Sequence, residues 1–209
     1  LLACDLSNIS GELSRCKAAG VDWIHFDVMD GAFVEQITYG SPVLKCVRKA
    51  TDMFLDVHLM VNDPMSQIKF FAEAGADLIS FHLESSSSAV QTLELIRSFG
   101  VKSALAIKPG TAAEEVYPLL SLCDMVLVMT VEPGYGGQAF IPETIEKIRQ
   151  LREYAGSDLD IEVDGGINAK TAPLVKEAGA NVLVAGTGLF KAEDMAQANA
   201  ALKTSQKGV

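Results

Sequence analysis

The sequence has few cysteines, and they lie far apart. Its four cysteines form no CxxC pair, so neither a disulfide framework nor a zinc ribbon is indicated. We expect buried, reduced thiols instead. No apolar run reaches the ~18 residues that span a membrane, and no signal peptide is visible. These absences predict a cytoplasmic protein with no membrane partner.

Positive charge is also scarce. The 17 Lys and Arg residues are outnumbered by 27 Asp and Glu residues, which gives a formal net charge of −10. Nucleic-acid backbones and anionic membrane surfaces repel such a chain, so neither is expected as a partner. A small anionic substrate is not excluded, because a few local backbone amides can outweigh the global field.

Short apolar runs alternate with amphipathic stretches along the whole chain, and no linker interrupts them. Hydrophobic residues make up 49% of the 209 residues, which is ample for one core. Near-continuous apolar strands joined by helices indicate a parallel sheet that is covered on its outer face. The expected strands are the runs 1–4, 22–29, 54–60, 77–83, 103–107, 124–131, 160–164 and 181–186.

Eight such units in 209 residues predict an α/β fold, a (β/α)8 TIM barrel that forms a single domain over residues 1–209. The first run opens in the middle of a strand, so we expect the first strand to be truncated at its N-terminus. Helical patterns occur at 64–75 and 142–154. A motif of the type AG-x-D or AG-x-N recurs before three expected strands, and its glycine is expected to end the preceding helix in a left-handed conformation.

Polar residues interrupt the strands near their carboxyl ends, where barrels of this kind carry their chemistry. The three histidines of the chain, His25, His58 and His82, all fall towards the ends of expected strands. Asp27 follows His25 by two positions, so strand alternation directs both side chains to one face, towards the barrel axis. Asp164 ends a later strand.

The residues His25, Asp27, His58 and Asp164 therefore predict a mixed nitrogen and oxygen site for one divalent ion, Zn, Fe, Mn or Co. The alternative is that each is a separately hydrogen-bonded core residue. His82 and Glu84 form a second H-x-E pair, which is a rival ligand set. Because Glu84 falls beside a serine-rich loop, we favour a supporting or structural role for that pair.

Three glycine-rich turns follow the last three expected strands: EPGYGGQ (132–138), DGG (164–166) and AGTGLF (185–190). Barrels often bind phosphate through backbone N–H groups after their last two strands. Glycine permits the close backbone approach that such a site needs. The turns predict a phosphorylated ligand, and the first of them is long enough to act as a lid.

Four segments of the chain, HFDVMDG, DVHLM, VMTVEPGYGGQAF and LDIEVDGGI, resemble in order the signature segments of the ribulose-phosphate 3-epimerase family. The resemblance implies a (β/α)8 barrel with one divalent metal ion. It also implies an isomerase of carbohydrate metabolism that interconverts D-ribulose 5-phosphate and D-xylulose 5-phosphate in the pentose phosphate pathway. The family's habit implies a homo-oligomer.

The matching positions imply roles for individual residues. His25, Asp27, His58 and Asp164 would hold the metal, and Asp27 and Asp164 would also be the catalytic acid and base. The residues implied to contact the substrate phosphate are Gly134, Tyr135, Gly136, Gly137, Gly165, Gly166, Gly186 and Thr187. Those implied to cap the reaction intermediate are Met29, Met60 and Met129. Without the resemblance, ordinary core filling is an equal alternative for the methionines.

The reaction agrees with the residues considered alone. Epimerisation next to a carbonyl removes one proton and returns another to the opposite face, which two opposed carboxylates can do. The loop GAFVEQIT (31–38) departs from the family pattern at Ala32, Glu35 and Gln36, which leaves the substrate open. The alternatives are a 3-epimerase of a hexulose phosphate such as D-allulose 6-phosphate, and a catalytically silent sugar-phosphate-binding barrel.

Overall fold

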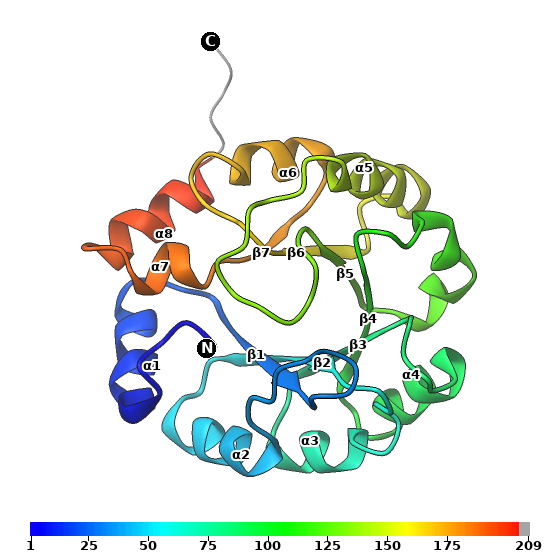
Figure 1. Cartoon of the computed structure of the whole chain (residues 1–209), viewed down its shortest axis with the longest axis horizontal. Coiled ribbons are helices and arrows are strands. Elements are labelled where there is room, and N and C mark those ends of the chain that lie inside the picture. The colour runs from blue at the N-terminus through cyan, green and yellow to red at the C-terminus, as the bar shows by residue number, and fades with distance from the viewer. Residues whose placement is uncertain (205–209) are drawn as a thin grey trace.

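Seven parallel strands form a nearly closed barrel in the computed structural model, which describes residues 1–204 (Figure 1). The strands are neighbours in chain order, from β1 to β7. Their bounds are β1 Trp23–Met29, β2 Phe54–Met60, β3 Leu78–His82, β4 Lys102–Ile107, β5 Met125–Met129, β6 Asp160–Asp164 and β7 Val182–Val184. Each lies within the predicted run or differs from it by one to two residues at an end.

Helices surround the sheet on its outer face (Figure 1). The α-helices are α1 Ile9–Ala18, α2 Ser41–Ala50, α3 Ile68–Ala74, α4 Ala89–Ser98, α5 Thr144–Ala155, α6 Ala172–Ala178, α7 Thr187–Phe190 and α8 Met195–Lys203. Three short 3₁₀ helices are η1 Leu6–Asn8, η2 Ala113–Glu115 and η3 Tyr117–Leu122, of which η2 and η3 connect β4 to β5. Within residues 1–204, no helix has the length and apolar character needed to cross a bilayer.

The run 1–4 does not form the strand that its apolar residues suggested. The terminal amino group of Leu1 donates a hydrogen bond to the carbonyl of His25 in β1 at 2.6 Å. The N–H of Cys4 then bonds back to the carbonyl of Leu1 at 3.0 Å, which closes a turn instead of extending a ladder. The expectation of an eighth strand here was therefore wrong for the described residues.

The recurrent glycines act as predicted. Gly75 ends α3 and Gly179 ends α6, both in the left-handed conformation, with φ of 102° and 114°. Gly20 follows α1 with φ of 72°. The expectation of buried thiols holds only in part: all four cysteines are free, but Cys16 is buried and Cys46 is exposed.

The two faces of the sheet explain why the strands are apolar almost throughout. Outward side chains such as Phe26, Val57 and Leu105 are fully buried under the helices. Inside the barrel, Leu78, Ala104 and Met125 form a separate cluster near the amino ends of the strands. The amino end of the barrel interior is therefore filled by apolar side chains, and the polar side chains lie towards the carboxyl ends of the strands.

Candidate active site

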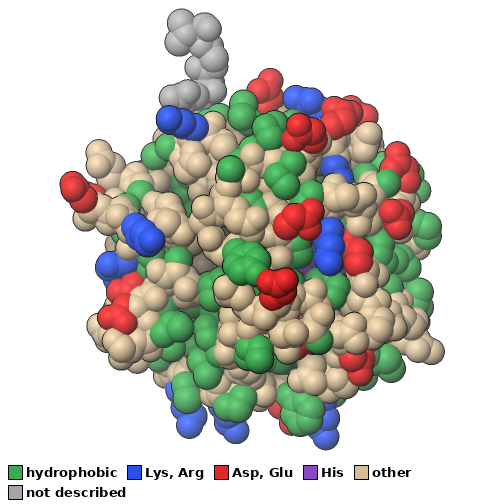
Figure 2. All heavy atoms as spheres, in the orientation of Figure 1, with side chains coloured by type: hydrophobic (Ala, Val, Ile, Leu, Met, Phe, Trp, Pro, Cys, Tyr) green, Lys and Arg blue, Asp and Glu red, His purple; other side chains and the backbone are tan. Residues whose placement is uncertain are grey.

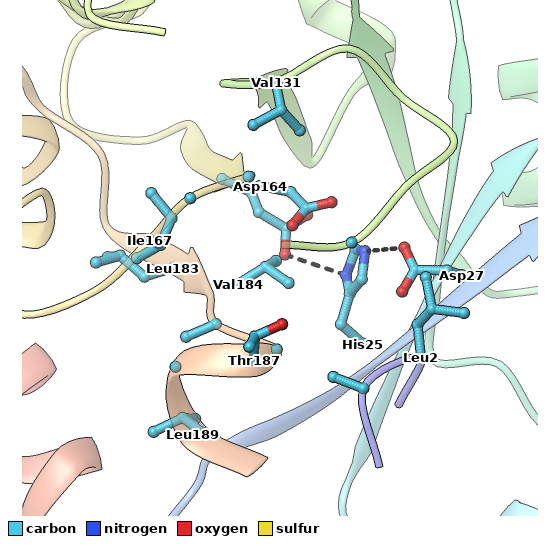
Figure 3. Close-up of a pocket in the computed structure, with 18 of the residues that line it drawn as sticks. Leu2, His25, Asp27, Val131, Asp164, Ile167, Leu183, Val184, Thr187 and Leu189 are labelled. Atoms are coloured by element: carbon cyan, nitrogen blue, oxygen red, sulfur yellow. Dashed lines mark ion pairs between the residues drawn. The ribbon is translucent and has the colours of Figure 1, made fainter. Parts of the chain in front are cut away.

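The structure brings together four polar side chains at the carboxyl ends of three strands. His25 and Asp27 come from β1, His58 from β2 and Asp164 from β6, and one ligand atom from each lies within 4.8 Å of the others. Parallel pairing sets Asp27 opposite His58 in the ladder. In Figure 3 the side chains of His25, Asp27 and Asp164 converge on one space. The convergence follows from strand alternation together with the register of the parallel sheet.

The imidazole of His25 lies between carboxylates. Its Nε2 is 3.3 Å from Oδ1 of Asp27. Its Nδ1 is 2.5 Å from Oδ2 of Asp56 and 3.6 Å from Oε1 of Glu162. Asp56 and Glu162 are each only 1% exposed, so they hold the ring from the barrel interior, and His25, Asp56 and Glu162 form a second group with metal-ligand spacing.

Asp56 and Glu162 were not expected from the sequence. Each lies two positions before a residue that was expected in the site: Asp56 precedes His58, and Glu162 precedes Asp164. The alternation that pairs His25 with Asp27 therefore also pointed to them. A buried carboxylate is costly without partners, and their partner, His25, comes from another strand, so alternation alone does not show that they would be paired.

Two ring nitrogens in the cluster are buried with no hydrogen-bond partner: Nε2 of His25 and Nδ1 of His58. A buried polar atom without a partner costs free energy, so such atoms in a native protein call for an explanation. Nδ1 of His58 lies 3.7 Å from Oδ1 of Asp27. Two imidazole nitrogens and two carboxylates are a donor set that suits a divalent transition metal or zinc ion, so the residues fit such an ion.

The two aspartates of the cluster have different electrostatics. Burial would raise the pKa of Asp27, but the positive charge of the neighbouring His25 holds that pKa well below its usual range. For Asp164, burial and the charge of Asp27 raise the pKa to about 6. Carboxyl groups with pKa values moved apart can serve as base and acid at one site.

His82, the third histidine, lies behind the cluster and is not a member of it. Its Nε2 is 3.0 Å from Nε2 of His58, and its Nδ1 is 3.1 Å from Oε2 of Glu84. Burial lowers the pKa of His82 to about 4. The rival ligand set of His82 and Glu84 is thus connected to the site through His58.

The three glycine-rich turns border one cavity, which is also lined by His25, Asp27 and Asp164 and extends along the seam between β1 and β7. Figure 2, in the orientation of Figure 1, shows backbone and side chains covering most of this face of the barrel. The turn after β6 packs tightly: a Cβ on Gly165 would lie 2.4 Å from Cγ2 of Val131, and one on Gly166 would lie 2.7 Å from the backbone nitrogen of Phe140. Both glycines have positive φ, so no other residue fits there without strain.

The three methionines line the same cavity. Met29 and Met60, paired in the ladder between β1 and β2, form a small buried cluster with Val34. Met129 packs in another buried cluster, with Ala106 and Leu127. The sulfur-containing side chains therefore lie on two sides of the polar site, as an apolar wall around it.

The loop after β1 is ordered by hydrogen bonds to Asp30, the residue that precedes it. Oδ1 of Asp30 accepts hydrogen bonds from the N–H groups of Ala32 and Phe33, and Oδ2 accepts one from Asn62. The ring centroid of Phe33 lies 4.8 Å from that of His82. Nζ of Lys108 lies over the Phe33 ring, 4.0 Å from its centroid, in a cation–π contact. Gln36 lines the cavity.

Comparison with known proteins agrees with these features. The model of the ribulose-phosphate 3 epimerase family matches residues 1–190. A ribulose-phosphate 3-epimerase, cytoplasmic isoform, from Oryza sativa subsp. japonica is 43% identical over 212 residues, covering 100% of this chain and 92% of its own. A ribulose-phosphate 3-epimerase from Bacillus subtilis (strain 168) is 42% identical over 210 residues, covering 99% and 97%.

Solved structures give the same fold at lower identity. A 3-hexulose-6-phosphate synthase superposes with a TM-score of 0.70 at 21% identity, covering 96% of this chain and 95% of its own. At this identity the likeness shows the barrel fold alone.

Proposed function

The chain belongs to the ribulose-phosphate 3-epimerase family, and from that premise we propose that it interconverts D-ribulose 5-phosphate and D-xylulose 5-phosphate. The observation that carries the proposal is the pair of carboxyl groups of Asp27 and Asp164. They reach one site from β1 and β6, and their pKa values are moved apart. Such a pair can act as a general base that removes one proton and a general acid that supplies another.

Asp27 and Asp164 divide the proton transfers between them. One carboxylate removes the proton from C3, and the electron pair of that bond passes into the carbonyl group to give an ene-diolate. The other carboxyl group then returns its proton to C3 from the opposite face, which inverts the carbon. In the reverse direction the two residues exchange roles. Solvent protons restore the starting ionisation of the pair after each turnover.

One divalent ion, Zn, Fe, Mn or Co, would be held by His25, Asp27, His58 and Asp164. When bound, such an ion polarises the carbonyl group and stabilises negative charge on the substrate oxygens, which is worth several kcal/mol. The unpartnered Nε2 of His25 and Nδ1 of His58 support this assignment. Asp56 keeps the other nitrogen of His25 occupied and so orients the ring.

The remaining residues hold the substrate. Backbone N–H groups of the turns containing Gly134, Tyr135, Gly136, Gly137, Gly165, Gly166, Gly186 and Thr187 would bind the phosphate. Those turns line the cavity beside the carboxyl pair, and glycine lets the backbone approach an anion closely. Met29, Met60 and Met129 would cover the intermediate with polarizable, water-poor surface.

A coupled assay with D-ribulose 5-phosphate and D-allulose 6-phosphate tests the function. It should be run on the protein as purified, after chelation, and after return of Zn²⁺, Fe²⁺, Mn²⁺ or Co²⁺. We expect turnover of the pentulose phosphate that is lost on chelation and restored by metal. Faster turnover of the hexulose phosphate would contradict the assigned substrate, chelator-resistant turnover would contradict the metal role, and no turnover of either would indicate a silent binding barrel.

Two further proposals concern the setting of the protein. Its four free thiols, together with the rice relative whose name gives a cytoplasmic isoform, support a location in the cytoplasm. The family resemblance supports a homo-oligomer, and sedimentation equilibrium of the purified chain would test it.

A further inference from the structure

A chain of three side chains leads from the proposed metal site into the wall of the barrel. Nε2 of His58 lies 3.0 Å from Nε2 of His82, and Nδ1 of His82 lies 3.1 Å from Oε2 of Glu84. Both rings are 0% exposed. Water therefore does not compete for their nitrogens, and each ring depends on its protein neighbours for hydrogen bonds.

Glu84 is fixed at the far end of this chain. Its Oε1 accepts a hydrogen bond from the backbone N–H of Lys108 at 2.8 Å and another from the hydroxyl of Thr111. Both donors come from the segment that follows β4. An ionised carboxylate only accepts hydrogen bonds, so the side of Glu84 that faces His82 requires a donor.

This requirement determines where the protons lie on both rings. Nδ1 of His82 must carry its proton to donate to Glu84, which leaves Nε2 of neutral His82 as an acceptor. Nε2 of His58 must then carry the proton of that ring, because one of two nitrogens 3.0 Å apart has to donate. Nδ1 of His58 is left with a lone pair, and this is the buried atom without a partner that faces Asp27.

We infer that Glu84 and His82 are positioning residues that set the tautomer of His58, so that Nδ1 of His58 presents its lone pair to a divalent cation. The inference rests on the proposed function for the identity of what binds there. The assignment of the two tautomers rests only on the hydrogen bonds within the protein.

Glu84→Gln tests this hydrogen-bond chain from Glu84 through His82 to His58, because a side-chain amide has one end that accepts and one that donates. The donors Lys108 N and Thr111 Oγ1 would draw the amide oxygen, so the amide NH₂ would face His82. Nδ1 of His82 must then accept, its proton moves to Nε2, and the proton of His58 is driven from Nε2 to Nδ1. Thr111→Val is the matched control, since it removes one hydrogen bond from Glu84 but keeps the carboxylate.

Long-range ¹H–¹⁵N NMR spectra of the metal-free protein report the tautomers directly. We expect His58 protonated on Nε2 and His82 on Nδ1 in the wild type and in Thr111→Val, and the reverse in Glu84→Gln. Competition with a chelator should then give a Co²⁺ Kd that is about 10- to 100-fold higher for Glu84→Gln, with little change for Thr111→Val. Thermal unfolding of the metal-free variants checks that each one is folded.

The outcomes separate this inference from the proposed function. The inference would be overturned if the wild-type protein showed the opposite tautomers. It would also be overturned if folded Glu84→Gln kept the wild-type tautomers and Co²⁺ affinity. If the wild type shows the expected tautomers but binds no divalent cation, the proposed metal role fails while the tautomer assignment stands. The Co²⁺ absorption spectrum gives a readout that does not depend on turnover.

Discussion

The hydroxyl of Tyr135 donates a hydrogen bond of 2.7 Å to Oε2 of Glu35, a residue one hundred positions earlier in the chain. Tyr135 belongs to the glycine-rich turn after β5, and Glu35 belongs to the loop after β1. Val34 also packs against Gly134, where a Cβ would lie 3.2 Å from that of Val34. The two loops are thus fastened together beside the cavity.

Tyr135→Phe should weaken the contact between the two loops without creating a cavity, because only the hydroxyl is removed. We expect KM for the ketose phosphate to rise by a factor of about 2 to 5, the size of effect that follows loss of one solvent-exposed hydrogen bond. Steady-state kinetics and limited proteolysis of the 132–138 turn would measure the change. Glu35→Gln keeps an acceptor at this position and should have the smaller effect; equal kinetics for wild type and Tyr135→Phe would show that the contact does not hold the loop.

Asp164→Asn keeps the shape of the side chain but removes its proton transfer. Interconversion of the two pentulose phosphates should fall by about 10²- to 10⁴-fold, the usual contribution of one general acid or base. Deuterium incorporation at C3 in D₂O, followed by NMR, would measure the step directly. Binding of inorganic phosphate should be retained, since the phosphate turns are untouched, and full epimerase activity in the variant would refute the acid–base assignment.

The raised pKa of Asp164, about 6, gives a prediction for the metal-free protein. Because the folded pKa exceeds the ordinary value of 3.8, the folded state binds more protons than the unfolded state between these values. The contribution of this carboxyl group to the free energy of unfolding therefore decreases as pH rises from about 4 to 6. Asparagine cannot ionise, so the stability of Asp164→Asn relative to wild type should increase over that window.

Urea unfolding of both proteins in the presence of a chelator, at pH values from 4 to 7, would test the prediction. The comparison subtracts the titrating groups remote from this site, since both proteins share them, and Asp27 stays ionised in both because its pKa lies well below its usual range. A difference in unfolding free energy that stays flat with pH would contradict the raised pKa.

The strands could be predicted from sequence because burial on both faces leaves long apolar runs that few other structures require. The run 1–4 is apolar too, yet Cys4 turns back to Leu1, and composition alone does not distinguish a turn from a strand over four residues. Convergence of His25, Asp27, His58 and Asp164 was predictable, since parallel strands bring their carboxyl ends to one edge of the sheet.

Contacts between distant loops were not predictable in the same way. No local pattern connects Tyr135 to Glu35, and the hydrogen bond depends on how two irregular loops lie across the barrel. The contacts of Asp56 and Glu162 with His25 could not be predicted from sequence for a related reason. A buried acid is unfavourable until its partner is known, and that partner comes from another strand.

Asp30 is expected to stabilise the loop after β1 through three backbone amides. Burial alone would raise its pKa, but the N–H groups of Asn62, Phe33 and Ala32 lower it overall. Asp30→Asn replaces one accepting oxygen with a donor and should cost about 1 kcal/mol of unfolding free energy at neutral pH. Because the folded pKa is lowered, this stabilisation is lost as pH falls through it, so the two proteins should converge in stability in acid. A gap that persists at low pH would indicate a cause other than the carboxylate.

Gly166 provides a test of the phosphate turns with an internal control. In Gly166→Ala the new Cβ would lie 2.7 Å from the backbone nitrogen of Phe140, at a φ of +67° that alanine adopts only with strain. The turn after β6 must then shift, so KM should rise and the free energy of unfolding should fall by about 1 kcal/mol or more. A Cβ on Gly136 meets nothing within 4 Å, so Gly136→Ala should leave stability nearly unchanged. Equal effects of the two substitutions, measured by steady-state kinetics and urea unfolding, would show that close packing of the turn after β6 does not position the substrate.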